Sequence, residues 1–343
     1  MRVLVAMSGG VDSSVAAALL LDAGHDVTGC TMKLWGGASD TGCCSVADVD
    51  DARRVAQQLG VDHFVFNFGD DFRATVVDPY VAAHAAGRTP NPCVECNRSL
   101  KFDRLARRAH ALGFDALATG HHARTEHAGG AWRLRRGVDG AKDQSYVLHM
   151  LDQVALGHTL LPVGHLTKGE VRRRAAALGL RTASKPESQD VCFITSEGGR
   201  RAFLGERLAM TPGRVVDTDG REVGRVTAVE LVTAGQRRGL GLAGGAEPRY
   251  AVAVDVAGAT VTVGGADDLL VDGIAVEAMS WVDSPVVSGA VEVQCSAHGA
   301  PRPAVFDANA SMVRFDRPAP RVAPGQSVVL YRGDEVLGGG SAA

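Results

Sequence analysis

The sequence predicts an α/β protein in which a parallel-sheet domain is followed by two small all-β domains, the last a β-barrel. Up to about residue 195, short apolar strands alternate with amphipathic helices. After Pro212 the chain changes to short β-type runs separated by Gly, Pro and Asp turns. A length of 343 residues is also too great for one ordinary core. We therefore expect domains at 1–204, 205–268 and 269–343.

The first domain shows strand and helix patterns in turn. In chain order we expect a strand at 3–7, a helix at 13–23, strand 27–33, helix 45–59, strand 63–67, strand 116–119 and helix 167–178. Ser45 with Asp48, and Thr167 with Glu170, have the spacing of helix-capping pairs. This alternation predicts a parallel sheet covered on both faces. The later β-type runs lie at 214–217, 250–255, 260–263, 273–280, 290–295, 311–315 and 327–331.

Composition restricts the class of protein. With 45% hydrophobic and 22% charged residues, the chain is typical of a soluble globular protein. Met1 and Arg2 lead directly into the first strand, without a signal peptide or membrane span, so we expect a cytoplasmic protein with no membrane partner. The net charge of −3 excludes a dedicated nucleic-acid packaging protein, and any RNA site must be local. Seven cysteines in a reducing compartment indicate metal-binding or reactive groups.

A Gly-rich turn at residues 8–14, SGGVDSS, separates the first strand from the first helix. Backbone N–H groups at such a helix start can hold a phosphate, and two glycines allow close approach. Ser8 and Ser13 add hydroxyl donors, and Asp12 is a candidate ligand for Mg²⁺. The run lacks the Gly-Lys-Ser/Thr ending of a Walker loop and resembles the PP-loop of the ATP pyrophosphatases.

Three cysteines are candidates for chemistry. Cys93 and Cys96 form a CxxC pair after RTPNP, which we expect to be a rigid loop and a poor place to bury a core, and Cys192 lies in SQDVCFI. A structural zinc site would need two more ligands, for example from Cys43-Cys44. Buried inert thiols are a second alternative, and reactive thiols or an iron–sulfur cluster are the third.

Motifs along nearly the whole chain resemble the tRNA-specific 2-thiouridylase (MnmA) family. Besides SGGVDSS they are GRTPNPCVECN (87–97), ATGHHAR (118–124), KDQSYVL (142–148), LLPVG (160–164), QDVCFI (189–194), GQRRGLG (235–241), EPRYAVAVD (247–255) and PGQSVVLY (324–331). The resemblance implies a PP-loop (adenine nucleotide alpha hydrolase-like) domain and a sulfurtransferase that uses ATP and Mg²⁺ to 2-thiolate the wobble uridine (U34) of tRNA. It also implies a sulfur-donor protein as a partner, and a monomer is the simplest expectation.

The resemblance also implies roles for individual residues. The ATP site falls on Ala6, Met7, Ser8, Gly9, Gly10, Val11, Asp12, Ser13, Met32 and Gly120. The nucleophilic cysteine falls on Cys96 and the persulfide-carrying cysteine on Cys192. The target base and tRNA contacts fall on Asn91, Pro92, Cys93, His121, Lys142, Asp143, Gln144 and Gln326.

Two sulfur-transfer mechanisms stay open. In one, Cys192 carries a persulfide whose terminal sulfur attacks the base, and Cys96 then breaks the S–S link, which leaves a Cys96–Cys192 disulfide. In the other, Cys93, Cys96 and Cys192 hold a [4Fe–4S] cluster with one open iron. Better-known members have Asp in place of Cys93, so the acid/base role assigned to that Asp is not carried over.

Several basic residues are candidates for RNA phosphate contacts, although each group alone is more often a solvated helix face: Arg104, Arg107, Arg108, Lys168, Arg172, Arg173 and Arg174. His122 is expected to be structural. Two other functions compete: an amide-forming PP-loop ligase, whose chemistry needs no such cysteines, and a non-catalytic RNA-binding or sulfur-carrier protein, which the intact Asp12 and Ser13 argue against.

Overall fold

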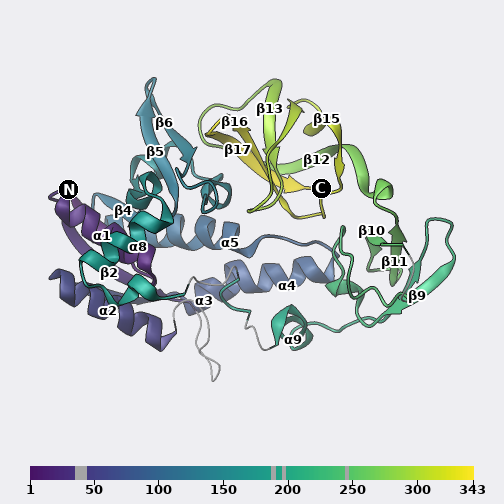
Figure 1. The fold of residues 1–343 in the computed structure, drawn as a ribbon, viewed down its shortest axis with the longest axis horizontal. Coiled ribbons are helices and arrows are strands. Elements are labelled where there is room, and N and C mark those ends of the chain that lie inside the picture. Colours follow the sequence, from purple (N-terminus) through teal and green to yellow (C-terminus); the bar gives the residue numbers. More distant parts are fainter. Residues whose placement is uncertain (35–44, 187–190, 195–197, 244–246) are drawn as a thin grey trace.

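A computed structural model describes residues 1–34, 45–186, 191–194, 198–243 and 247–343 (Figure 1). The N-terminal unit contains a five-stranded sheet in the order β3-β2-β1-β4-β7, and every pairing in it is parallel. Its strands are β1 (Arg2–Ala6), β2 (Asp26–Lys33), β3 (His63–Asn67), β4 (Ala116–Thr119) and β7 (Thr159–Leu160). The predicted α/β class is confirmed.

Three helices pack against this sheet as the sequence pattern predicts: α1 (Val11–Asp22), α2 (Val46–Leu59) and α8 (Lys168–Ala177). Both predicted capping boxes form, because Ser45 accepts a hydrogen bond from the Asp48 amide and Thr167 accepts one from the Glu170 amide. Gly60 adopts the left-handed conformation that ends α2. The helix predicted at 13–23 begins two residues earlier, at Val11.

A second group of helices carries the sequence between β3 and β4. It comprises α3 (Gly69–Phe72), the π-helical segment η1 (Arg73–Val77), α4 (Asp78–Ala85), α5 (Pro92–Glu95), the π-helical segment η2 (Cys96–Leu105) and α6 (Ala106–Ala111). In Figure 1, α4 and α5 extend from the α/β unit toward the two β units. Their apolar residues contribute to one hydrophobic cluster, hereafter the large cluster, which includes Phe72, Tyr80, Cys96 and Leu100 and extends to Val329 and Tyr331 of the barrel. This group therefore links the sheet to the rest of the molecule.

The shorter elements complete the N-terminal unit. They are η3 (Ser145–Leu148), α7 (Gln153–Gly157), η4 (Pro162–His165), η5 (Arg181–Ser184) and α9 (Gly199–Gly205). In the part of the chain that the structure describes, no helix combines the length and apolar character needed to cross a membrane.

The central unit is a four-stranded sheet in the order β10-β11-β8-β9. Its elements are β8 (Gly213–Val216), β9 (Glu222–Val226), η6 (Val229–Leu231), β10 (Tyr250–Asp255), β11 (Thr260–Gly264) and η7 (Asp267–Leu269). Val215, Val261 and Val263 are fully buried in a separate small core. The all-β prediction for this part is confirmed.

The C-terminal unit is a closed barrel. Its strands are β12 (Leu270–Trp281), β13 (Ser288–Gln294), β14 (Arg302–Asp307), β15 (Met312–Pro320), β16 (Ser327–Arg332) and β17 (Glu335–Ala342). The order is β12-β15-β14-β13-β16-β17, and β12 pairs with β17 to close the ring. Closure leaves no free sheet edge among these strands, and the predicted barrel is confirmed.

A hairpin that the sequence pattern did not predict fastens the barrel to the N-terminal unit. Strands β5 (Ala123–Ala128) and β6 (Ala131–Arg136) extend the barrel sheet, because β6 pairs with β17. Asp334 forms ion pairs with Arg124 at 2.7 Å and Arg135 at 2.6 Å. The hairpin is rich in arginine because those side chains pair with the barrel instead of filling a core.

The segment 87–91, just before α5, is a second joint. The Thr89 amide donates to the Pro324 carbonyl at 2.7 Å, and the Gln326 side-chain amide donates to the Thr89 carbonyl at 3.1 Å. Arg88 is ion-paired with Glu277 of the barrel. The Thr89 hydroxyl lies 3.4 Å from that of Thr233, which is in the central unit between η6 and β10. Both β units therefore hold the turn that precedes Cys93 and Cys96.

Candidate functional site

The predicted phosphate loop connects β1 to α1 at the C-terminal edge of the sheet, where open α/β sheets bind ligands. Gly9 has φ +73°, and a Cβ there would overlap the Asp48 carbonyl oxygen at the start of α2. The loop is held by the Ser8 amide, which donates to the Ser13 hydroxyl at 3.2 Å, and by the Ser13 hydroxyl, which donates to the Gly10 carbonyl at 3.2 Å. These constraints keep the backbone in one shape.

The N-terminus of α1 is suited to an anion. The first amides of α1, as in any α-helix, have no intrahelical acceptor, and the N-cap residue Gly10 has no side chain that could accept from them. The helix dipole adds positive potential at the same place. Of the other predicted ATP-site residues in β1 and the loop, Ala6 ends β1, Met7 is buried beneath the loop, and Val11 begins the helix.

Asp12 is engaged by two residues far away in sequence. Its carboxylate accepts from Lys168 Nζ at 2.6 and 2.9 Å and from His122 Nε2 at 3.0 Å. Burial alone would raise the Asp12 pKa, but the hydrogen bonds from His122 and Lys168 outweigh it and lower the pKa below its usual 3.8. Asp12 is therefore ionised at neutral pH, as a ligand of Mg²⁺ must be.

Sequence reasoning missed these two partners. It assigned Lys168 to RNA phosphate contacts and left His122 as structural, whereas both contact the phosphate loop. The capping box of α8 was the available signal, because a helix start that is fixed at Thr167 also fixes the direction of the next side chain.

Lys185 is a further residue at the loop that sequence reasoning missed. Its ammonium donates to the Gly9 carbonyl at 3.0 Å, to Asp48 at 2.6 Å and to Asp51 at 2.7 Å. Burial would lower the Lys185 pKa, but the two carboxylates raise it above its ordinary value, so the ammonium stays charged. Lys185 thus ties the phosphate loop to α2, and no local sequence pattern indicates it.

Gly120 and His121 follow β4 at the same edge of the sheet. A Cβ on Gly120 would lie 2.6 Å from the Ser13 amide nitrogen, so glycine is required where β4 meets α1. His121 is buried, and its Nδ1 lies 2.7 Å from the Thr119 hydroxyl. Burial, followed by the charge of Lys101, lowers the His121 pKa well below 6.5, so its imidazole is neutral. Its ring also lies 6.0 Å from that of Phe102 on η2.

The two CxxC thiols lie on a helix and not on the predicted loop. Asn91 caps the helix by accepting from the Cys93 amide at 3.0 Å, and Pro92 follows at the first helical position. The Pro-rich run is thus a helix start. The expectation that it could not bury a core is also wrong, because Cys96 is only 9% exposed and belongs to the large cluster, whereas Cys93 is half-buried.

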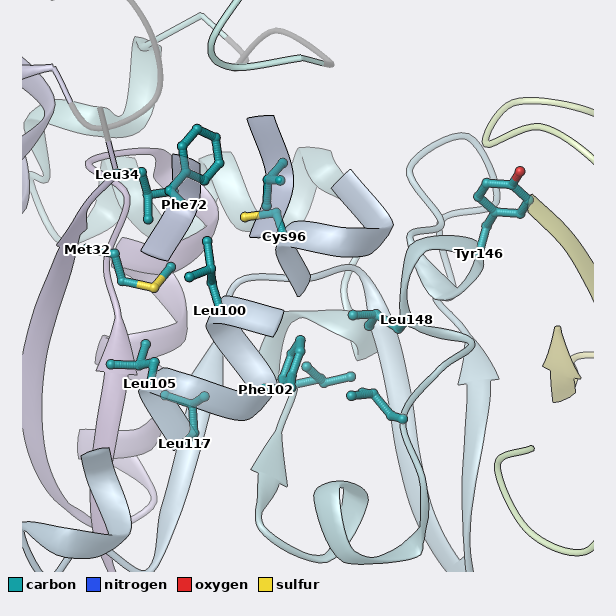
Figure 2. Close-up of a cluster of buried hydrophobic side chains, with 14 of the residues drawn as sticks. Met32, Leu34, Phe72, Cys96, Leu100, Phe102, Leu105, Leu117, Tyr146 and Leu148 are labelled. Carbon is teal, nitrogen blue, oxygen red and sulfur yellow. The ribbon is translucent and has the colours of Figure 1, made fainter. Parts of the chain in front are cut away.

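Figure 2 shows the surroundings of Cys96. Its sulfur points toward the part of the cluster that contains Leu100, Phe72, Leu34 and Met32. Met32, a predicted ATP-site residue, is near the C-terminal end of β2 and is mostly buried here. The candidate nucleophile Cys96 and the candidate ATP-site residue Met32 therefore belong to the same packed region.

Cys192 is half-buried and packs against the large cluster as well. Cys96 and Cys192, which are 96 positions apart in sequence, therefore both pack in or against the large cluster. Across the described residues, no group of three or more His, Cys, Asp and Glu side chains is arranged to hold a metal ion. Cys43, Cys44, Gln189 and Asp190 lie outside the described residues.

Some of the other predicted RNA-contact residues form hydrogen bonds within the protein, and others are at least partly exposed to solvent. Asp143 accepts hydrogen bonds from Arg136, Ser145 and the Gly137 amide, so it organises its own loop. Gln144 is exposed, but its side chain accepts from the His122 amide at 2.9 Å. Gln326 holds Thr89 in the 87–91 segment. Lys142 is half-buried.

Arg172, on α8, donates to the carbonyls of Ala183 and Lys185 and so supports the Lys185 contact. On the helix after the CxxC pair, Arg104 is ion-paired with Asp71 at 2.9 Å, and Arg107 with Asp103. Arg173 and Arg174 are exposed on α8. Of these basic residues, Arg173 and Arg174 are exposed, whereas Arg172, Arg104 and Arg107 have local hydrogen-bond or ion-pair partners.

The SGGVDSS turn, placed at an uncapped helix start beyond the first strand of a parallel sheet and carrying an ionised aspartate, is typical of the ATP-using enzymes of the PP-loop class. Residues 1–196 match the family model described as the tRNA methyl transferase HUP domain, 201–265 match its PRC-barrel domain, and 271–341 match the aminomethyltransferase beta-barrel domain.

Curated relatives define the family more narrowly. The tRNA-specific 2-thiouridylase MnmA of Chloroflexus aurantiacus is 49% identical over 350 residues, which cover 99% of this chain and 97% of that protein. The protein of the same name from Mycolicibacterium paratuberculosis is also 49% identical, over 98% of each chain. A solved 4-thiouridine synthetase–RNA complex with bound ATP overlaps 56% of this chain and 44% of its own, with TM-score 0.38 and 20% identity. The chain belongs to the tRNA-specific 2-thiouridylase (MnmA) family.

Proposed function

We propose that this chain catalyses the ATP-dependent 2-thiolation of the wobble uridine, U34, of tRNA in the cytoplasm. As a member of the 2-thiouridylase family it is a tRNA sulfurtransferase. One observation carries the proposal: Met32, Cys96 and Cys192 all lie in or against the large cluster. Met32 lies at the same sheet edge as the phosphate loop, so activation and sulfur transfer can act on one base.

ATP is needed because uridine C2 cannot easily expel its oxygen. O2 attacks the α-phosphorus, the bond to pyrophosphate breaks, and the oxygen becomes part of an AMP leaving group. The amides at the start of α1 and the hydroxyls of Ser8 and Ser13 are placed to hold the phosphates. Asp12 would hold Mg²⁺, which when bound offsets the phosphate charge. Lys168 supplies a positive charge within reach of the same phosphates.

Sulfur transfer follows in the persulfide mechanism. The terminal sulfur of a Cys192 persulfide attacks C2, and the C2–O bond breaks to release AMP. The Cys96 thiolate then attacks the Cys192 sulfur, and the original S–S bond breaks with its electron pair on the transferred sulfur. The products are 2-thiouridine and a Cys96–Cys192 disulfide, which an external thiol must reduce before the next turnover. Burial of Cys96 limits the access of other thiols and oxidants to its sulfur.

The cluster mechanism has less support from the described residues. Cys93 and Cys96 are one helical turn apart, yet with Cys192 they form no metal-binding group in this conformation. We derive no step through a cluster. Its remaining support is the third thiol, Cys93, for which the persulfide scheme has no role.

Binding of tRNA needs a base that is turned out of the anticodon loop. We propose that Asn91, Pro92 and Cys93 receive the base beside the neutral His121, and that Lys142, Gln144 and Gln326 contact the RNA. The 87–91 segment supports this assignment, because the barrel and the central unit hold the turn that carries the triplet. A sulfur-donor protein and a monomeric enzyme complete the proposal.

The test is a reaction of purified protein with unmodified tRNA, ATP and a sulfur source, followed by mass spectrometry of the nucleosides. We expect 2-thiouridine with equal amounts of AMP. The description of the matching family model names a tRNA methyl transferase. The same mass spectra should therefore also be searched for methylated uridine. Absence of both 2-thiouridine and AMP would overturn the proposal.

Two further measurements separate the alternatives. Cys96→Ser and Cys192→Ser should each abolish 2-thiouridine yet retain tRNA-dependent ATP–pyrophosphate exchange; full turnover by both would favour an amide-forming ligase. A carrier protein without catalysis would show no such exchange in the native chain. Anaerobic purification with an iron count and an absorption spectrum decides between the persulfide and the cluster, because thiolation without iron excludes the latter.

A further inference from the structure

We propose that Phe193 is the positioning residue that holds Cys192 beside Cys96 for sulfur transfer. The proposal rests on the function proposed above, and nothing in that function assigns a role to Phe193. Cys192 itself is half-buried, whereas the next residue, Phe193, is only 6% exposed. A reactive thiol is thus joined directly to a deeply buried anchor.

The anchor is a cage of three aromatic rings. The Phe193 ring lies 5.5 Å from Phe72 at 76°, 5.6 Å from Tyr80 at 87°, and 5.0 Å from Phe203 at 59°. These separations and tilts are those of favourable edge-to-face or tilted pairs. The edge of one ring meets the face of another, so the cage specifies both the position and the orientation of Phe193.

The cage residues come from separate elements. Phe72 is on α3, Tyr80 on α4 and Phe203 on α9, and all three are buried. Tyr80 also contacts His84, with ring centroids 4.6 Å apart. Because three helices contribute one ring each, the anchor position depends on the fold and not on the short segment 191–194.

The same cage is continuous with the surroundings of Cys96. Phe72 contacts Phe193 and is also a member of the large cluster with Cys96 and Leu100, as Figure 2 shows for these three residues. Phe72 therefore contacts Phe193 directly and belongs to the same cluster as Cys96.

This arrangement has a kinetic consequence. Adjacent Cα atoms are about 3.8 Å apart, so the Cys192 sulfur cannot move far from a fixed Phe193. Restricting one reactant beside another raises its effective concentration and so speeds the step that joins them. Removing the ring should slow only the steps that need Cys96 and Cys192 together, and adenylation should continue.

The experiment compares Phe193→Ala, Phe193→Leu and Phe193→Tyr with the native chain. The first readout is the rate at which diamide, which takes two electrons and two protons from the thiols, forms the Cys96–Cys192 disulfide, measured by mass spectrometry. The second is single-turnover formation of 2-thiouridine. The third is tRNA-dependent ATP–pyrophosphate exchange. Ile194→Ala is the matched control, because Ile194 is partly buried against the same cluster.

We expect Phe193→Ala to slow disulfide formation and thiolation about tenfold or more, with pyrophosphate exchange within about twofold of the native rate. Phe193→Leu should be intermediate, Phe193→Tyr should recover most of the rate, and Ile194→Ala should change little. An unchanged disulfide rate in Phe193→Ala, or an equal loss of pyrophosphate exchange, would overturn the proposal. If the native chain makes no 2-thiouridine, the proposed function fails, while the disulfide rates still test the anchor.

Discussion

The phosphate loop and the thiol site are built in different ways. Residues 8–14 are contiguous, and local hydrogen bonds among Ser8, Gly10 and Ser13 set most of the loop shape. The proposed thiol site needs Cys96 and a segment 96 residues later, and both pack in or against the large apolar cluster. A local motif can therefore position an anion, whereas a reaction between two side chains depends on how separate helices pack.

The largest effect should come from the loop backbone. Gly9→Ala would force a side chain into a position with φ +73° and into overlap with the Asp48 carbonyl. We expect ATP–pyrophosphate exchange to fall by about 100-fold or more, because the loop must move to relieve the overlap. The diamide-driven Cys96–Cys192 disulfide should still form at the native rate. Loss of both would show that the two regions are not separable, and Gly129→Ala, in an open turn, is the control.

Lys168→Met should lower pyrophosphate exchange by about 10- to 100-fold, because a charge-assisted contact to Asp12 and the nearby phosphates is removed. Arg173→Met, on the exposed face of the same helix, should leave the rate nearly unchanged. Isothermal titration with ATP would show whether binding weakens as well. If both variants lowered the rate equally, Lys168 would act through the overall positive charge of α8 and not through its contact with Asp12.

Acid should lower the stability of the folded protein mainly through two histidines, His84 and His149, that tertiary packing buries. Burial, then the charge of Arg200, lowers the His84 pKa to about 4, and burial, then Arg98, lowers the His149 pKa to about 3. The unfolded chain takes up these protons near its ordinary pKa of 6.5, so stability is full above pH 6.5 and declines as the pH falls. The loss is about 1.4 kcal/mol per pH unit for each histidine, down to its folded pKa.

Thermal unfolding between pH 7.5 and 5 checks this prediction. His149→Gln should reduce the dependence of Tm on pH. The variant lacks one imidazole whose pKa differs between the folded and the unfolded protein. Exposed His110→Gln should not change it. A Tm that is independent of pH in this window would contradict the assignment.

The smallest effect should come from the barrel joint. Asp334→Ala removes ion pairs to Arg124 and Arg135, but Asp334 is 44% exposed, so we expect a cost of about 1 kcal/mol or less. The KM for tRNA should rise severalfold, while ATP–pyrophosphate exchange at saturating tRNA stays near native. Asp316→Ala, on the exposed side of β15, is the control. A large loss of exchange would show that barrel docking also shapes the ATP site.

Sequence patterns located most of the regular elements. The strand at 63–67 and the two capping boxes are present as predicted, because each depends on residues within one or two turns of chain. The β5–β6 hairpin escaped prediction, since its arginines are satisfied by Asp334 and Glu335 of the barrel. The thiols were expected on a loop because Pro92 was interpreted as a turn signal and not as the first residue of a helix.

By itself the sequence determined the α/β-then-β architecture, the phosphate turn and the identities of the candidate thiols, because periodicity, glycine spacing and motif residues are local properties. Only the tertiary structure decided that Lys168, His122 and Lys185 surround the phosphate loop and that Cys96 is buried. It also decided that Phe193, the residue after Cys192, packs among the rings of Phe72, Tyr80 and Phe203. Those contacts join residues tens to more than a hundred positions apart, and packing between elements, which no short window of sequence encodes, determines which of them meet.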